Sequence, residues 1–112
     1  MSFEINYSKK FKKELKRLRK RYSSILEDVN SLALQLSDNP FQGVDLGNGL
    51  RKIRLAITSK GKGKSGGARV ISYNILVGEQ DGHVLLLMIY DKSDRESLSD
   101  KELNDLVAAY KE

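Results

Sequence analysis

One short segment limits the folds open to this chain more than any other. From His83 to Tyr90 nearly every residue is apolar, and the longest apolar run, Val84 to Ile89, is six residues long. A strand of this composition is buried on both faces, so it belongs in the centre of a sheet. Six apolar residues are far too few to cross a bilayer. We therefore expect a sheet protein without a membrane span, built around His83–Tyr90.

Alternating apolar and polar residues predict three more strands. They cover residues 3–7, 52–57 and 69–77, and the second carries Lys52 and Arg54 on its outward face. Residues 43–49 are expected to form a turn-rich loop. Residues 58–67 hold four glycines and three lysines and are expected to form a flexible segment.

Capping residues and apolar spacing predict three helices. Ser8 is expected to cap the first. Ser24 with Glu27 forms a capping box for the second, which ends at Asn39-Pro40, and Ser99 with Glu102 forms one for the third. The apolar stripes of the three helices are Phe11, Leu15, Leu18 and Tyr22; Ile25, Val29, Leu32, Ala33 and Leu36; and Leu103, Leu106, Val107 and Tyr110.

The element order is thus β-α-α-β-β-β-α, an α+β fold. We expect residues 1–112 to form a single domain in which an N-terminal helical hairpin packs on a small, mainly antiparallel twisted sheet, followed by a short C-terminal helix. The chain has no cysteine, one histidine and no signal-peptide pattern at its start. A cytoplasmic protein without a metal or other cofactor is the expectation.

The positive charge is concentrated in two blocks. Residues 9–21 contain nine Lys or Arg and one acid, and residues 51–69 contain seven and no acid, within a total net charge of +5. Seven like charges repel one another, so a block that only served as a solvated surface would carry this cost without a benefit. The second block therefore favours a polyanionic partner such as nucleic acid. Lys64 and Ser65 match the end of a nucleotide-binding loop, but position 58 is Thr and a strand follows, so we reject that motif.

Several segments together carry a family resemblance. These are residues 50–55, the glycine-lysine loop, Gly66-Gly67-Ala68-Arg69-Val70-Ile71, and Tyr90-Asp91-Lys92. In this order they resemble the RelE/ParE toxin superfamily, most closely its RelE/HigB-like branch, over essentially the whole chain. The resemblance implies a RelE-like fold and the toxin of a bacterial type II toxin–antitoxin system.

In the RelE branch, such a toxin is an mRNA interferase, an endoribonuclease that cleaves mRNA in the ribosomal A site and inhibits translation. The implied reaction is attack of an RNA 2′-hydroxyl on the adjacent phosphate, without a metal. The resemblance assigns the chemistry to Lys52, Arg54, Arg69, Tyr90 and Lys92. We expect Lys52 or Lys92 to be the base, the arginines to stabilise charge, and Tyr90 to stack on a base or orient the phosphate.

Other basic residues are candidates for RNA or ribosome binding: Arg51, Lys60, Lys62, Lys64, Lys9, Lys13, Lys16 and Lys20. The expected partners are the ribosome, mRNA and a cognate antitoxin with an acidic, partly disordered segment. Two alternatives stay open: a ParE-like inhibitor of DNA gyrase with the same fold, and a non-catalytic basic RNA-binding domain. The direction of Arg69 is also open. Alternation puts it on an apolar face, unless a bulge at Gly66-Gly67 turns it or it emerges at the edge of the sheet.

Overall fold

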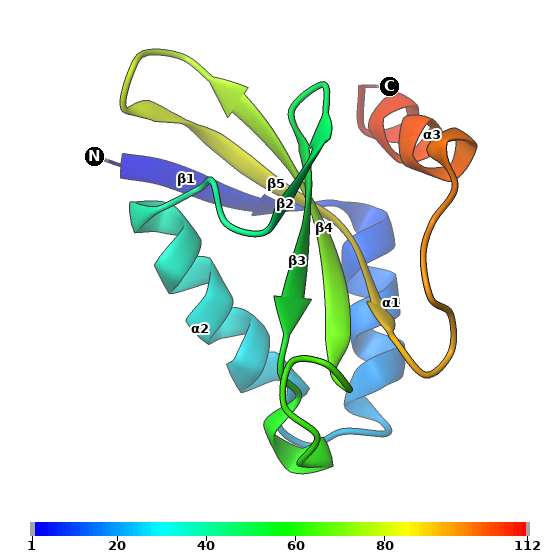
Figure 1. Cartoon of the computed structure of the whole chain (residues 1–112). Coiled ribbons are helices and arrows are strands. Elements are labelled where there is room, and N and C mark those ends of the chain that lie inside the picture. The colour runs from blue at the N-terminus through cyan, green and yellow to red at the C-terminus, as the bar shows by residue number, and fades with distance from the viewer. Residues whose placement is uncertain (1, 112) are drawn as a thin grey trace.

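The computed structural model describes residues 2–111. Its elements are β1 (Ser2–Tyr7), α1 (Lys9–Arg19), α2 (Ile25–Asp38), β2 (Val44–Gly47), β3 (Leu50–Leu55), a 3-10 turn (Thr58–Lys60), β4 (Ala68–Leu76), β5 (Asp81–Asp91) and α3 (Asp100–Lys111). The strands form one sheet in the order β1-β5-β4-β3-β2 (Figure 1). Only β1 and β5 pair in parallel, so the mainly antiparallel α+β prediction is confirmed.

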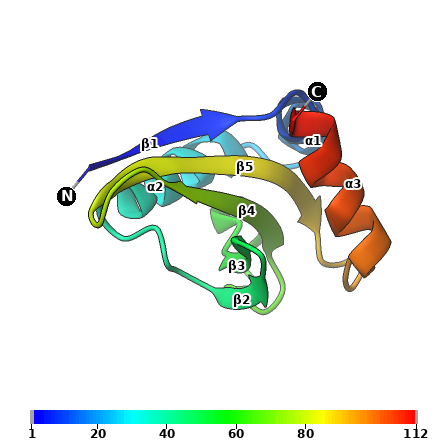
Figure 2. The ribbon, with the colours of Figure 1, turned by 90° about the horizontal axis from the view of Figure 1, so that it is seen from above.

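The sheet is covered on both faces, as its most apolar strand requires. β5 lies between β1 and β4, and its residues from Val84 to Asp91 are all buried. On one face α1 and α2 pack over a core that includes Phe11, Val70 and Leu86. On the other face α3 packs over a smaller core, and Figure 2 shows α3 beside the C-terminal half of β5.

Two of the three helix starts form as predicted. The Ser8 hydroxyl accepts a hydrogen bond from the Phe11 N–H at 3.0 Å. Ser99 and Glu102 form the reciprocal capping box, with bonds of 3.1 and 3.0 Å. The box predicted for Ser24 is wrong: its backbone is helical, and its hydroxyl accepts the Ser59 N–H at 2.8 Å and donates to Asp28 at 2.8 Å, without a bond to an N–H of the helix.

The segments expected to be loops contain two ordered elements. Residues 44–47 form β2, an edge strand paired with β3, which adds one strand to the predicted order. Its sequence Val-Asp-Leu-Gly alternates, but the run is only four residues long and lies between turn-forming residues, Gly43 and Asn48-Gly49, which indicate a loop. All four residues of β2 are exposed. The segment 58–67 begins with the 3-10 turn, where the Asp28 carboxylate accepts bonds from the Thr58 N–H and hydroxyl at 2.9 and 2.6 Å. The segment ends in β4, not in a helix, which supports the rejection of a nucleotide-binding loop.

A β-bulge decides which side chains of β5 face α3. Ile71 pairs with Met88 but Ser72 pairs with Leu86, so Leu87 is an extra residue on β5. Leu87 and Met88 therefore both belong to the core under α3. Beyond them the alternation is shifted by one residue, which places Tyr90 on the α3 face.

Gly67, directly before β4, lies against the end of β3. A Cβ atom there would lie 2.1 Å from the Leu55 carbonyl oxygen, whereas a Cβ at Gly78 would meet nothing within 4 Å. We expect Gly67→Ala to lower the free energy of unfolding by about 1–3 kcal/mol, because the strands must separate. Gly78→Ala is the matched control and should change it by less than about 0.5 kcal/mol. Urea unfolding of both variants measures the difference, and equal stabilities would contradict the close contact.

Candidate functional site

Three of the side chains assigned to chemistry form a row across the sheet. Arg54 on β3 lies opposite Arg69 on β4, and Arg69 lies opposite Tyr90 on β5. Directly opposite residues of neighbouring strands share a face, with Cβ atoms about 4.5–5.5 Å apart. Lys52 lies one step along the same face of β3, opposite Ile71. The structure therefore brings Lys52, Arg54, Arg69 and Tyr90 together, on the face away from α1 and α2.

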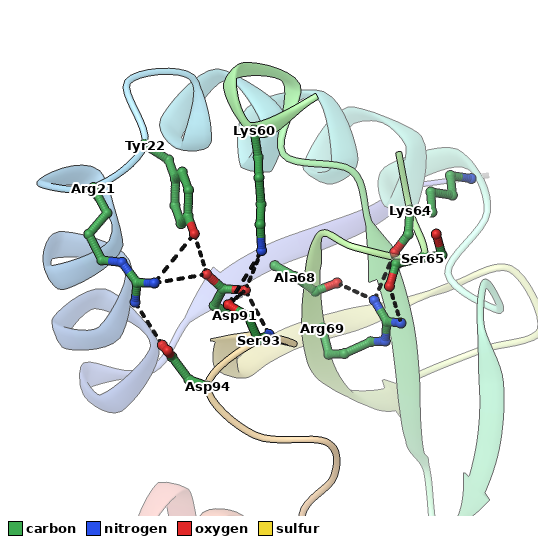
Figure 3. A network of polar contacts seen from close by, with 10 residues as sticks. All are labelled: Arg21, Tyr22, Lys60, Lys64, Ser65, Ala68, Arg69, Asp91, Ser93 and Asp94. Atoms are coloured by element: carbon green, nitrogen blue, oxygen red, sulfur yellow. Dashed lines mark hydrogen bonds and ion pairs between the residues drawn. The ribbon is translucent and has the colours of Figure 1, made fainter. Parts of the chain in front are cut away.

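Arg69 is buried and also holds the basic loop. It is only 5% exposed, and its guanidinium donates to the carbonyl oxygens of Lys64 at 2.9 Å, Ala68 at 3.1 Å and Ser65 at 3.4 Å (Figure 3). No register shift occurs at the start of β4, so its alternation is regular there and the bulge considered at Gly66-Gly67 does not form. Arg69 thus lies in the row and fixes the loop that carries Lys64.

Tyr90 is the buried end of the row. Its ring lies beneath the Arg95 guanidinium, whose Cζ is 6.0 Å from the ring centroid. Among the described residues, no group hydrogen-bonds to the buried Tyr90 hydroxyl. Burial raises the pKa of Tyr90, against the lowering effect of Arg69 and Arg95. The hydroxyl is therefore protonated at neutral pH and has no acceptor among the described residues, but hydroxyl and ring are both buried, so in this conformation neither contacts a ligand.

Lys92 lies apart from the row, among the lysines of the loop. It follows the end of β5, and its N–H donates to the Gly67 carbonyl at 3.1 Å. Its side chain lines a hollow of about 240 Å³ together with Lys60, Lys62, Gly66 and Ser93. A predicted catalytic lysine and two predicted RNA-binding lysines therefore share one small cationic hollow.

The residue that organises this end of the molecule was not among the predicted site residues. Asp91 is fully buried, and its carboxylate accepts hydrogen bonds from Lys60 Nζ at 2.8 Å, from the Tyr22 hydroxyl, and from Ser93 (Figure 3). Arg21 completes an ion pair at 3.3 Å. Burial alone would raise the pKa of Asp91, but the bonds from Lys60, Tyr22 and Ser93 outweigh burial and hold it well below its usual range.

The remaining predicted residues lie outside the row. Arg51 lies on the opposite face of β3 from Lys52, and it donates to the carbonyls of Gln42 and Gly43, each at 2.9 Å. Lys64 is exposed on the loop. Four exposed lysines lie on α1, over the opposite face of the sheet: Lys9, Lys13, Lys16 and Lys20.

Within residues 2–111, no three His, Cys, Asp or Glu side chains are grouped closely enough to hold a metal ion. None of the helices described in that range is both long enough and apolar enough to span a membrane.

Comparison with known proteins finds a matching family and similar solved structures. The sequence profile of the family described as "RelE toxin of RelE / RelB toxin-antitoxin system" matches residues 4–112. Among solved structures, an arginine double mutant of the E. coli toxin RelE in the free state is similar, with a TM-score of 0.61 and 13% sequence identity. The similarity covers 97% of this chain and 98% of that chain, and at this identity it shows a shared fold.

Because Asp91 is buried among positive groups, its loss should destabilise the fold strongly. Asp91→Asn should lower the free energy of unfolding at neutral pH by about 3–5 kcal/mol, since it leaves the largely buried Lys60 without its counter-charge. The exposed partner of Arg21 is the control, and Asp94→Asn should cost less than about 1 kcal/mol. Equal effects of the two variants in urea unfolding would contradict the anchoring role of Asp91.

The same carboxylate predicts a pH dependence. A pKa lowered on folding adds stability above the unfolded value of about 3.9, and this contribution is lost as the pH falls below it. Wild type should lose stability steeply below about pH 4, and Asp91→Asn less steeply. Parallel stability curves for wild type and variant between pH 5 and pH 2 would exclude Asp91 as the source.

Proposed function

Because this chain belongs to the RelE toxin family of toxin–antitoxin systems, we propose that it is a ribosome-dependent mRNA endoribonuclease that inhibits translation. The observation that carries the proposal is the row Arg54–Arg69–Tyr90 with Lys52 beside it. Two guanidinium groups, an ammonium group and a free hydroxyl on one face are the groups that recognise and stabilise a phosphodiester.

The proposed reaction needs no metal. The RNA 2′-oxygen loses its proton and attacks the adjacent phosphorus, while the bond from phosphorus to the 5′-oxygen breaks and that oxygen takes up a proton. The products are a 2′,3′-cyclic phosphate and a 5′-hydroxyl. The protein must supply a base, positive charge around the five-coordinate phosphorus, and a proton donor.

We assign these roles from position. Lys52 is favoured over Lys92 as the base, because Lys52 shares the face of the row whereas Lys92 lines the hollow with Lys60 and Lys62. Arg54, which is exposed at the open end of the row, and Arg69 stabilise the phosphate charge. The Tyr90 hydroxyl, protonated and without a partner among the described residues, donates to a phosphate oxygen.

The proposed ribosome contacts lie on two separate surfaces. The loop lysines Lys62 and Lys64 extend the cationic surface from the row, and Lys92 in the adjoining hollow adds to it. The second surface is α1, where Lys9, Lys13, Lys16 and Lys20 recur at spacings of four, three and four and so lie along one side of the helix. Two surfaces on opposite faces suit a protein that is wedged between RNA segments, as the ribosome would require.

The family implies a cognate antitoxin as partner. We propose that an acidic segment of the antitoxin, disordered alone, covers Lys52 and Arg54 or displaces α3. In the first position the segment would shield the row from RNA, and in the second it would change what packs over Tyr90.

The first test is cleavage of mRNA on translating ribosomes, with EDTA at a level that leaves ribosomes intact. Wild type should cleave, and Lys52→Ala and Arg54→Ala should each reduce the rate roughly 100-fold, since each removes charge from the transition state. Lys101→Ala is the control, because that exposed lysine pairs only with Asp105 and should leave the rate unchanged. Equal cleavage of naked RNA would point to an ordinary nuclease, and gyrase poisoning without cleavage to a ParE-like inhibitor.

The second test concerns the antitoxin. Association should be fast and should slow steeply with rising salt, because charge complementarity acts mainly on the association rate. Stopped-flow binding at several ionic strengths measures this, with Lys52→Ala expected to weaken the salt dependence. An association rate independent of salt would rule out neutralisation of the basic surface as the means of restraint.

A further inference from the structure

Arg95, in the loop between β5 and α3, lies directly over the buried end of the row. Its Cζ is 6.0 Å from the centre of the Tyr90 ring. Its Nη2 donates to Glu102 at 2.8 Å and to the Ser97 carbonyl at 3.1 Å, and its Nε approaches the same carbonyl at 3.3 Å. A positive charge that the sequence analysis did not single out thus adjoins Tyr90, the residue opposite Arg69.

The contacts of Arg95 leave it able to bind another anion. Among the described residues its Nη1 donates to no group, and its side chain is 39% exposed. An ion pair between two exposed groups contributes little to stability, so the bond to Glu102 is easily exchanged. A guanidinium can bind a phosphate through two parallel N–H bonds. With Glu102 it makes only one such bond, because the same carboxylate oxygen also accepts the Ser99 N–H.

Glu102 can release Arg95 without losing all of its own partners. Its carboxylate also accepts the Ser99 N–H at 3.0 Å in the capping box of α3. Hydrogen bonds from Arg95 and Ser99 lower its pKa to about 2, so Glu102 is ionised at neutral pH and competes with any phosphate for Arg95.

We propose that Arg95 is a further phosphate-binding residue of the site, held by Glu102 until RNA displaces it. The proposal rests on the proposed nuclease function. When Arg95 moves from Glu102 to an RNA phosphate, it leaves the Tyr90 ring, so that one movement adds a cation and opens access to the Tyr90 hydroxyl. Glu102 is then the competitor that sets how readily RNA engages the site.

The test is a double-mutant cycle of Arg95→Ala and Glu102→Gln. Glutamine can still accept the Ser99 N–H, so the capping box is kept. RNA binding is measured by fluorescence anisotropy with a 2′-deoxy-substituted mRNA oligonucleotide, which cannot be cleaved, at several salt concentrations. Cleavage is measured on translating ribosomes, and melting temperatures check the fold.

Arg95→Ala should weaken binding and reduce the slope of log K against log salt by about 0.7, the loss of one phosphate contact on a single strand. It should also lower kcat/KM for cleavage. Glu102→Gln should tighten binding severalfold, and this gain should vanish when Arg95 is also Ala, because the two residues act on one another. Asp105→Asn removes another acid from α3 and is the control, which should tighten binding far less than Glu102→Gln.

The inference is overturned if Arg95→Ala leaves the salt slope unchanged, or if Glu102→Gln has the same effect with and without Arg95. The second result would mean that Glu102 affects RNA binding only through the overall negative charge of α3 and not through Arg95. These outcomes are distinct from failure of the proposed function, in which wild type itself does not cleave mRNA on ribosomes.

Discussion

The buried carboxylate of Asp91 is the interaction on which the positions of the other groups depend. It joins the end of α1, through Arg21 and Tyr22, to the loop after β3, through Lys60, at the point where β5 ends. A buried charge is stable only when it is fully paired, so these segments can meet in few other ways. Tyr90 and Lys92 flank Asp91 in the chain, so the contacts of Asp91 also fix the positions of these two site residues.

The basic loop is held from other sides as well. Asp28 binds the backbone and hydroxyl of Thr58 at its start, and Arg69 binds the carbonyls of Lys64 and Ser65 near its end. Like charges on a free loop would spread apart, whereas tethered carbonyls keep them near the row. A cationic surface fixed before RNA arrives needs little reorganisation to stabilise developing charge.

Local patterns explain which features could be predicted from the sequence. The apolar run of β5, the Ser99–Glu102 box and the basic residues of β3 are short-range signals, and each leads to the observed element. The row follows from them only with the resemblance, which joined Arg54, Arg69 and Tyr90 before their register was known. The Ser24 box failed because the Ser24 hydroxyl oxygen accepts the N–H of Ser59, 35 positions away, instead of an N–H of its own helix. Asp91 and Arg95 were missed because their importance comes from contacts made in the folded chain, such as that between Asp91 and Tyr22, 69 positions away.

The extra residue at Leu87 has a consequence for comparing related chains. Deleting Leu87 would leave Tyr90 opposite Arg69, but if the same residues ran as a regular strand without the bulge, the faces of Tyr90 and Asp91 would be exchanged, because strand side chains alternate with a period of two. The phenol would then enter the core under α1, and the carboxylate would enter the row and oppose the phosphate. In a relative whose fifth strand has the same number of residues but no bulge, the functional counterpart of Tyr90 must therefore stand one position away in the aligned sequence. An ungapped sequence alignment would pair the wrong residues there, and equivalent residues have to be identified by the face of the sheet on which they lie.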